Sequence, residues 1–304
     1  MSVLLNKPNL FIVGMPKCGT TSLYNSLRQH PDIFMSAFKE PHYFGKDLTR
    51  LNNLYFQKEE EYLKLFTTKQ KISIIGETSP HYLFSHSAPQ EIIKFNPSSK
   101  IIILLRNPTD LVYSLYLQYL YSGNENELNI SKSLELEENR KKGENLPPDI
   151  DLVEKIFYKT YIFKMPGQIK RYLKIFGESA VKILLLEDLI QDMEGTFKEI
   201  LLFLEVDSNF KPDFELKNPY KTFRNKFIRN WIKKLSPKFG ELRNKFTTKP
   251  LGVMKYIENL NTKYPQKEPL DPVIKLKLDK DFYPVIKELE IIINRNLSTW
   301  YKNN

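Results

Sequence analysis

A short apolar run that passes through a glycine-containing loop into a helical segment most constrains the fold of this chain. Residues 9–14 read Asn-Leu-Phe-Ile-Val-Gly, and a run this short and this apolar indicates a buried strand. In residues 19–28, Leu23, Tyr24 and Leu27 recur at helical spacing. A strand, a glycine-containing loop and a helix in this order open a βαβ unit. We therefore predict that this segment begins a parallel sheet.

Three further apolar runs are predicted to join this sheet, at residues 71–76, 100–105 and 181–186. The run at 100–105 is apolar without alternation, which is typical of parallel strands covered on both faces. Helical patterns lie between the runs, and strands that alternate with helices favour a doubly wound α/β fold. The predicted fold class is thus α/β, with a P-loop-like parallel sheet flanked by helices and a helical C-terminal region.

Helices are predicted between the strands and in the C-terminal part. The predicted helical segments are residues 88–95, 108–121, 131–142, 151–176, 192–204 and 272–296. Pro166 and Pro284 lie inside two of these segments. Because proline lacks an N–H donor and clashes with the preceding turn, we expect both helices to be interrupted there.

Strand patterns stop after Asp207, and the remainder of the chain is basic, aromatic and mainly helical. We predict a single domain over residues 1–304, with an α/β core in residues 1–207 and a basic helical part in residues 208–304. The net charge of +10 fits either a solvated lysine surface or a cleft that concentrates an anionic ligand.

The small number of cysteine and histidine residues limits the disulfides and metal sites that this chain can form. Cys18 is the one cysteine of the chain, so no intramolecular disulfide forms, which is typical of a reducing compartment. The four histidines are scattered without a ligand spacing, so no metal is expected. Residues 1–10 lack the apolar run of a signal peptide, and the apolar runs are far shorter than the ~20 residues of a membrane helix. We therefore expect a cytoplasmic chain without a membrane span.

The loop after the first predicted strand has the spacing of a phosphate-binding loop with one change. Gly14 and Gly19 match the glycines of the pattern G-x-x-x-x-G-K-[ST], and Thr21 matches its last position. Thr20 stands where that pattern has its lysine, and Lys17 lies inside the loop instead. A nucleoside triphosphate with magnesium normally needs the lysine after the second glycine, so we expect a different phosphorylated ligand.

This loop keeps the physics of an anion cradle. Backbone N–H groups and the start of the following helix attract an anion. The hydroxyls of Thr20, Thr21 and Ser22 add donors, and Lys17 brings a point charge.

Residues 16–22, Pro-Lys-Cys-Gly-Thr-Thr-Ser, resemble the 5′-phosphosulfate loop of the sulfotransferases that use 3′-phosphoadenosine 5′-phosphosulfate (PAPS). The residues that this resemblance implies as cofactor ligands are Lys17, Cys18, Gly19, Thr20, Thr21 and Ser22. Residues 104–114 are similar to the 3′-phosphate element of the same family, which assigns Arg106 and Ser114 to the 3′-phosphate. Arg106 also follows a buried strand directly, where ligands bind in open α/β sheets and a guanidinium can bind phosphate bidentately.

Residues 76–83, Gly-Glu-Thr-Ser-Pro-His-Tyr-Leu, resemble a segment of the heparan-sulfate-type members, with Thr78 in place of a lysine. The glutamate of that segment is the general base, so the resemblance implies this role for Glu77. His81 is the competing base, because cytosolic-type members use a histidine in a comparable part of the chain and its ordinary pKa is suitable.

Residues 36–44 resemble the Lys-Glu-x-His-Phe-Phe segment of the family, which implies that Lys39 lies near the transferring sulfate. Glu40 and His42 are interpreted as structural or acceptor-facing. Residues 221–225 are a candidate for a basic loop that closes over the 3′-phosphate, although they lack its glycine-rich form.

The resemblance covers residues 9–207 and implies transfer of a sulfuryl group from PAPS to a hydroxyl or amine, with PAP as product and no metal. The catalytic residues would be Glu77, Lys17 and Lys39. A carbohydrate is the first choice of acceptor, and a lipid or small metabolite is the alternative. A P-loop kinase conflicts with Thr20, and a non-catalytic binder of polyanions, nucleic acid included, leaves the phosphate motifs unexplained. The acceptor, the choice between O- and N-sulfation, and the oligomeric state are not determined by the sequence.

Overall fold

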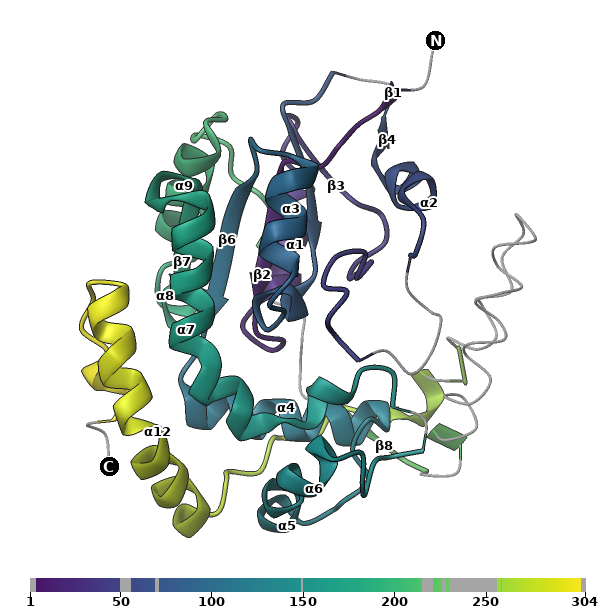
Figure 1. Ribbon diagram of the computed structural model, residues 1–304, viewed down its shortest axis with the longest axis vertical. Coiled ribbons are helices and arrows are strands. Elements are labelled where there is room, and N and C mark those ends of the chain that lie inside the picture. The colour runs from purple at the N-terminus through teal and green to yellow at the C-terminus, as the bar shows by residue number, and fades with distance from the viewer. Residues whose placement is uncertain are drawn as a thin grey trace.

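A five-stranded parallel sheet forms the centre of the computed structural model (Figure 1), with strand order β3-β5-β2-β6-β7. The structure describes residues 4–49, 56–68, 71–148, 150–214, 221–225, 228–229, 256–257 and 259–301. The strands of the central sheet are β2 (Leu10–Gly14), β3 (Ile33–Met35), β5 (Ile74–Thr78), β6 (Lys100–Leu105) and β7 (Val181–Leu185). Helices lie on both sides of this sheet, which confirms the predicted doubly wound α/β class.

The two central strands are buried on both faces. Residues 10–13 of β2 and residues 101–105 of β6 have no exposed surface. Apolar side chains on both faces of these strands are in contact with covering helices, as the lack of alternation predicts.

The helices lie mostly where the sequence places them. The longer ones are α1 (Thr20–Leu27), α3 (Ala88–Phe95), α4 (Pro108–Ser122), α7 (Tyr158–Phe176), α9 (Met193–Leu204) and α12 (Pro272–Ile292). The short ones are α2 (Glu59–Leu63), α5 (Ile130–Glu135), α6 (Glu137–Lys141) and α8 (Leu186–Gln191). In Figure 1 the arrow of β6 points toward α4, so the carboxyl ends of the parallel strands face this helix.

The predicted interruptions at Pro166 and Pro284 are wrong, because α7 and α12 both continue through their prolines. Each proline costs its helix one hydrogen bond. Core contacts on both sides of Pro166, through Ile162 and Ile169, offset that cost. Helix α12 packs in turn against α7 and α4, so tertiary packing rather than local propensity sustains both helices.

Several short elements were not predicted. They include the edge strand β3, helix α8 and the antiparallel pairs β1 (Leu4–Leu5) with β4 (Thr67–Thr68) and β8 (Thr222–Phe223) with β9 (Thr262–Lys263). Strands β8 and β9 lie beyond Asp207, where no strand was expected. Elements of two or three residues carry too few side chains for a periodic pattern.

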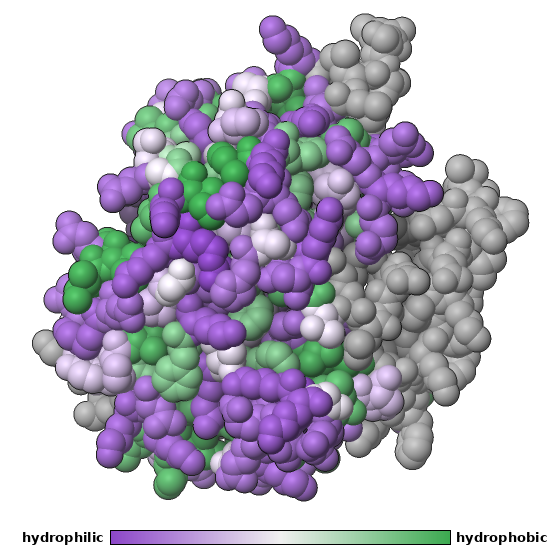
Figure 2. Space-filling view, in the orientation of Figure 1, coloured by the Kyte–Doolittle hydropathy of each residue, from purple (hydrophilic) through white to green (hydrophobic). Residues whose placement is uncertain are grey.

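The surface visible in Figure 2 is mainly hydrophilic, with small apolar areas scattered over it. Scattered apolar side chains of this kind are normal on a soluble surface. Among the described helices, none combines the length and the apolar character that a membrane crossing requires. The predicted cytoplasmic location stays a prediction.

Candidate active site

A cavity of about 1020 Å³ opens at the carboxyl ends of the strands. Its walls come from the segments that follow β2, β3, β5, β6 and β7 and from the cavity-facing side of α4. This is the edge at which ligands bind in open α/β sheets. The predicted ligand residues that line it are Lys17, Gly19, Thr20, Thr21, Ser22, Lys39, Arg106 and Ser114.

The loop between β2 and α1 needs its two glycines. Gly14 and Gly19 have φ angles of 139° and 87°, which disfavour residues with a side chain. A Cβ atom at Gly14 would lie 2.4 Å from the carbonyl oxygen of Leu104, and one at Gly19 would lie 2.8 Å from Leu186. Lys17 also has a positive φ, of 71°, which is uncommon for a residue other than glycine. The loop is thus held in a tight conformation that presents Lys17 and the start of α1 to the cavity.

Four cationic side chains gather on this side of the cavity, and we call them the cation cluster: Lys17, Arg106, Lys221 and Lys267. Burial first, and then the charges of the other three members and of Lys39, together lower the pKa of Lys17 to about 8. Within the described residues, no carboxylate lies at ion-pair distance from any of the four. Asp110 and Glu187 attract Lys267 and Arg106 from beyond that distance, so the cluster keeps an excess of positive charge, which favours an anionic ligand.

Polar contacts fix the members of the cluster. The Lys17 ammonium donates to Gln118 on α4 over 3.4 Å, and the Arg106 guanidinium donates to the main-chain oxygen of Lys17 over 3.2 Å. Lys267 lies 4.6 Å from the centre of the Tyr113 ring. Sequence reasoning missed Lys267, which comes from a segment without a motif, whereas Lys221 lies in the basic segment 221–225.

Cys18 does not line the cavity, because its side chain is fully buried in the core. Burial raises the pKa of its thiol, so the side chain stays neutral. The placement therefore leaves only main-chain atoms of Cys18 for the predicted cofactor contact.

Two ion pairs line the other side of the cavity, and we call it the paired side. The Lys39 ammonium lies 2.6 Å from Oε1 of Glu40, and the Lys155 ammonium lies 2.6 Å from Oδ2 of Asp151. Burial by itself would raise the pKa of the Glu40 carboxyl, but Lys39 and His42 hold that pKa well below its ordinary value. Glu40 is therefore a carboxylate at neutral pH, on the cavity wall.

Glu77 does not lie on the wall of this cavity. Strand β5 extends to Thr78, two residues beyond the predicted strand end, so Glu77 is inside the strand rather than past it. Its side chain has no exposed surface and does not line the cavity. Burial raises its pKa to about 7, although hydrogen bonds from Ser79, Tyr62 and Tyr82 act against that rise. This placement does not favour the predicted role of Glu77 as the general base.

The hydrogen bonds of Glu77 point to a positioning role. Its carboxylate accepts from the hydroxyls of Ser79 over 2.6 Å and Tyr82 over 3.1 Å. The same two hydroxyl oxygens accept from the main-chain N–H groups of His42 and Phe44, over 3.4 Å and 3.2 Å. Glu77 thereby anchors the segment that carries Lys39 and Glu40 into the cavity.

His81 lines the cavity between the two sides but is buried. One ring nitrogen, Nδ1, forms a hydrogen bond with the Tyr161 hydroxyl. Burial first, and then the charge of Lys155, hold the pKa of His81 well below its ordinary value. The imidazole is therefore neutral at physiological pH.

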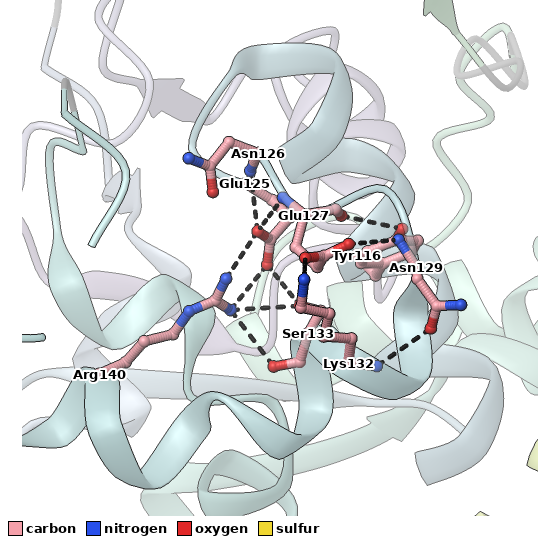
Figure 3. A network of polar contacts seen from close by, with 8 residues as sticks. All are labelled: Tyr116, Glu125, Asn126, Glu127, Asn129, Lys132, Ser133 and Arg140. Carbon is pink, nitrogen blue, oxygen red and sulfur yellow. Dashed lines mark hydrogen bonds and ion pairs between the residues drawn. The ribbon is translucent and has the colours of Figure 1, made fainter. Parts of the chain in front are cut away.

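A buried charge network holds the segment after α4, which contributes Asn124 to the cavity wall. The Arg140 guanidinium donates to both carboxylate oxygens of Glu125 over 2.7 Å each, as Figure 3 shows. Hydroxyls of Ser133 and Tyr158 also donate to this carboxylate. Because both charged groups are fully buried, the network fixes the segment next to Asn124 firmly. No sequence motif marks it.

Comparison with known proteins shows the family of this chain. The family model described as "Sulfotransferase domain" matches residues 7–246. Carbohydrate sulfotransferase 15 of Rattus norvegicus is 28% identical over 252 residues, which cover 66% of this chain and 44% of that protein. Bifunctional heparan sulfate N-deacetylase/N-sulfotransferase 4 of Mus musculus is 28% identical over 214 residues, which cover 67% of this chain and 23% of the relative. The chain thus spans less than half the length of these two relatives.

A solved structure extends the similarity over nearly the whole chain. The crystal structure of a sulfotransferase from Alicyclobacillus acidocaldarius superposes with a TM-score of 0.73 and 27% identity. The superposition covers 97% of this chain and 99% of that one. With the family model matched over most of its length, the chain belongs to the sulfotransferase domain family.

Proposed function

We propose that this protein transfers a sulfuryl group from PAPS to an acceptor hydroxyl or amine, on a carbohydrate. The observation that carries the proposal is one cavity that joins a phosphate-type loop and the cation cluster beside it to an ionised carboxylate, Glu40. The named relatives that modify carbohydrate and heparan sulfate support the choice of acceptor.

The cation cluster and its neighbours fit the donor. Lys17, with the hydroxyls and N–H groups at the start of α1, would hold the 5′-phosphosulfate, and Arg106 with Ser114 the 3′-phosphate. The donor supplies an activated sulfuryl group. Positive charge at Lys17 stabilises the negative charge that develops on the leaving phosphate, which is the usual electrostatic contribution of such a site.

We propose Glu40 as the general base in place of Glu77. The acceptor oxygen or nitrogen forms a bond to sulfur while the bond from sulfur to the bridging phosphate oxygen breaks, and the acceptor proton passes to the Glu40 carboxylate. Glu40 lines the cavity and is ionised, whereas Glu77 is buried away from it. Lys39, on the same wall, would stabilise charge on the sulfuryl oxygens.

Binding of PAP, the desulfated product, tests the donor assignment. Calorimetric titration of the purified protein is expected to show micromolar or tighter PAP binding and much weaker ATP binding. Arg106→Ala is expected to weaken PAP binding about 10- to 100-fold, because charge-assisted hydrogen bonds to phosphate are lost. Arg28→Ala is the matched control, since Arg28 is exposed and does not line the cavity. Folded protein without PAP binding would contradict the proposed function.

PAP affinity is also expected to depend on pH above about 8. The Lys17 ammonium of the free protein has a pKa of about 8, and a bound phosphate favours its charged form. Binding at higher pH therefore takes up a proton, and the dissociation constant is expected to rise up to tenfold per pH unit above 8. Lys17→Arg stays charged at these pH values, so its PAP affinity is expected to change little. If the dissociation constant for PAP rises equally steeply with pH in the wild type and in Lys17→Arg, a group other than Lys17 titrates.

A further inference from the structure

The charged residues of the cavity fall into two groups by their electrostatic neighbours. Lys17 is influenced by the three other members of the cation cluster and by Lys39. His81, which also lines the cavity, is influenced by Lys155, Glu40 and Lys39, and His42 by Glu40, Lys155 and Asp151. Lys39 influences both Lys17 and His81, so it lies where the cation cluster and the paired side meet.

The cation cluster matches the charge of the donor. Its four described members carry +4 together. The 3′-phosphate of PAPS carries roughly −2, and the phosphosulfate contributes one negative charge from each half, so the donor brings about −4 in total. Occupation by PAPS therefore leaves little uncompensated positive charge in the cluster.

The paired side has no net charge among its described residues. Two lysines, Lys39 and Lys155, are each 2.6 Å from a carboxylate, which gives two positive and two negative charges. The histidines beside them, His42 and His81, have pKa values lowered by burial and are neutral. An anionic group that entered this side would find no cation without a carboxylate partner and would meet the charges of Glu40 and Asp151.

The polar groups that remain on the paired side are suited to hydroxyls. The Asp151 side chain lines the cavity and is 22% exposed, so its carboxylate keeps acceptor capacity beyond its bond to Lys155, although its Oδ1 atom is buried and has no hydrogen-bond partner among the described residues. Ser122 and Asn124 also line the cavity and can exchange hydrogen bonds with a hydroxyl. Tyr119 adds an aromatic side chain to this lining.

From this arrangement we infer that the paired side takes an uncharged, hydroxyl-rich acceptor such as a neutral oligosaccharide, and that Asp151 accepts a hydrogen bond from one of its hydroxyls. The inference rests on the proposed function and names the acceptor class of the same cavity. The Asp151–Lys155 pair then determines the preference for uncharged over anionic acceptors, because Asp151 neutralises the Lys155 charge that would otherwise attract an anionic chain.

The test compares acceptors that differ in charge, with radiolabelled PAPS at saturation. The uncharged set is chitotetraose, cellotetraose and lactose, and the anionic probe is a heparosan tetrasaccharide, in which every second sugar carries a carboxylate. The wild-type protein is expected to sulfate at least one uncharged acceptor with kcat/KM at least tenfold above that for heparosan. Preference for heparosan, or transfer to none of the uncharged acceptors by protein that binds PAP, would overturn the inference.

Substitutions in the pair provide a second readout, the ratio of kcat/KM for uncharged over anionic acceptor. Asp151→Asn keeps the shape and leaves Lys155 uncompensated, so the ratio is expected to fall about tenfold. Lys155→Met removes the positive charge and is expected to raise the ratio. Glu138→Gln is the matched control, because Glu138 forms a 2.6 Å pair with Lys141 on the outer surface. A ratio that moves no more in Asp151→Asn than in Glu138→Gln contradicts the role of the pair.

The PAP titration separates the two proposals. Variants that bind PAP as the wild type does but show the wrong acceptor preference overturn only the acceptor inference. Protein that binds no PAP and transfers nothing overturns the proposed function itself.

Discussion

Replacement of Glu40 by glutamine is expected to lower kcat about 10²- to 10⁴-fold, the usual contribution of a positioned general base. The substitution keeps the shape of the side chain and removes the carboxylate that we propose as the general base. PAP binding is not expected to weaken, because Glu40 carries a negative charge and lies outside the cation cluster. Steady-state transfer from PAPS and PAP calorimetry on the same preparation measure the two quantities.

The pH dependence of kcat distinguishes Glu40 from Glu77. The pKa of Glu40 is held well below its ordinary value, so a Glu40 base stays ionised down to about pH 5 and the rate is expected to be flat between pH 5.5 and 7.5. Glu77 has a pKa of about 7, so as the base it would lose activity tenfold per unit below that pH. His42 and His81 have lowered pKa values and add no step in this range.

Glu77→Gln is the matched comparison for Glu40→Gln. Glutamine at position 77 keeps an oxygen that can accept from Ser79 or Tyr82. We expect a smaller loss of kcat than at position 40 and an unchanged pH profile, because Glu77 acts through the segment that it anchors. Glu77 would be the general base if Glu77→Gln lowered kcat more than Glu40→Gln does and if the wild-type rate fell below about pH 7 in a way that Glu77→Gln abolished.

The second large effect is expected at the buried pair of Glu125 and Arg140. Arg140→Met is expected to lower the free energy of unfolding by about 3–5 kcal/mol, because it leaves a buried carboxylate without its cation. Total stabilities are about 5–15 kcal/mol, so this is a large fraction. Urea unfolding at pH 7 measures it.

Two comparisons make that measurement specific. Glu125→Gln together with Arg140→Met removes both charges and is expected to recover part of the loss. Lys141→Met, one residue along on the exposed side of α6, is the control and is expected to cost less than about 1 kcal/mol. If the single and double variants are equally destabilised, the loss comes from packing rather than from the unpaired charge.

The pH dependence of Arg140→Met has a definite sign. In the wild type, burial would raise the pKa of Glu125, but Arg140 and its other partners hold it below the ordinary value. The lowered pKa of Glu125 means that its ionised form stabilises the folded protein above the ordinary pKa of a glutamate. This stabilisation is lost as the pH falls through the lowered pKa of Glu125. In Arg140→Met the folded pKa rises instead, so the loss relative to wild type is expected to shrink as the solution is acidified.

The motifs of the two predicted phosphate elements could be found from the sequence because each is local. Lys17 and the hydroxyls at the start of α1 are set by a loop of a few residues between two glycines. Arg106 follows a strand whose continuous apolar run is unmistakable. In a parallel sheet the ends of such strands meet at one edge, so the topology alone brings these groups together.

The choice between the two glutamates depended on a strand boundary. The apolar run at 71–76 predicts that Glu77 lies past the strand end, but β5 runs on through Glu77 to Thr78 because β2 pairs with it there. Pairing between strands is a tertiary property that a local pattern does not contain. Glu40 follows β3, an edge strand of three residues that shows no pattern of its own.

By itself the sequence determined the α/β class through apolar periodicity, and its motifs supplied the family resemblance and the residues of the two predicted phosphate elements, because patterns of both kinds are encoded within short segments. Only the tertiary structure decided that Glu40 rather than Glu77 faces the cavity, that Lys267 joins the cation cluster and that Asp151 pairs with Lys155 on the cavity wall. The placement of Glu40, Glu77 and Lys267 depends on burial and on distances between remote segments, and the local Asp151–Lys155 pair reaches the cavity wall only through the packing of the whole chain.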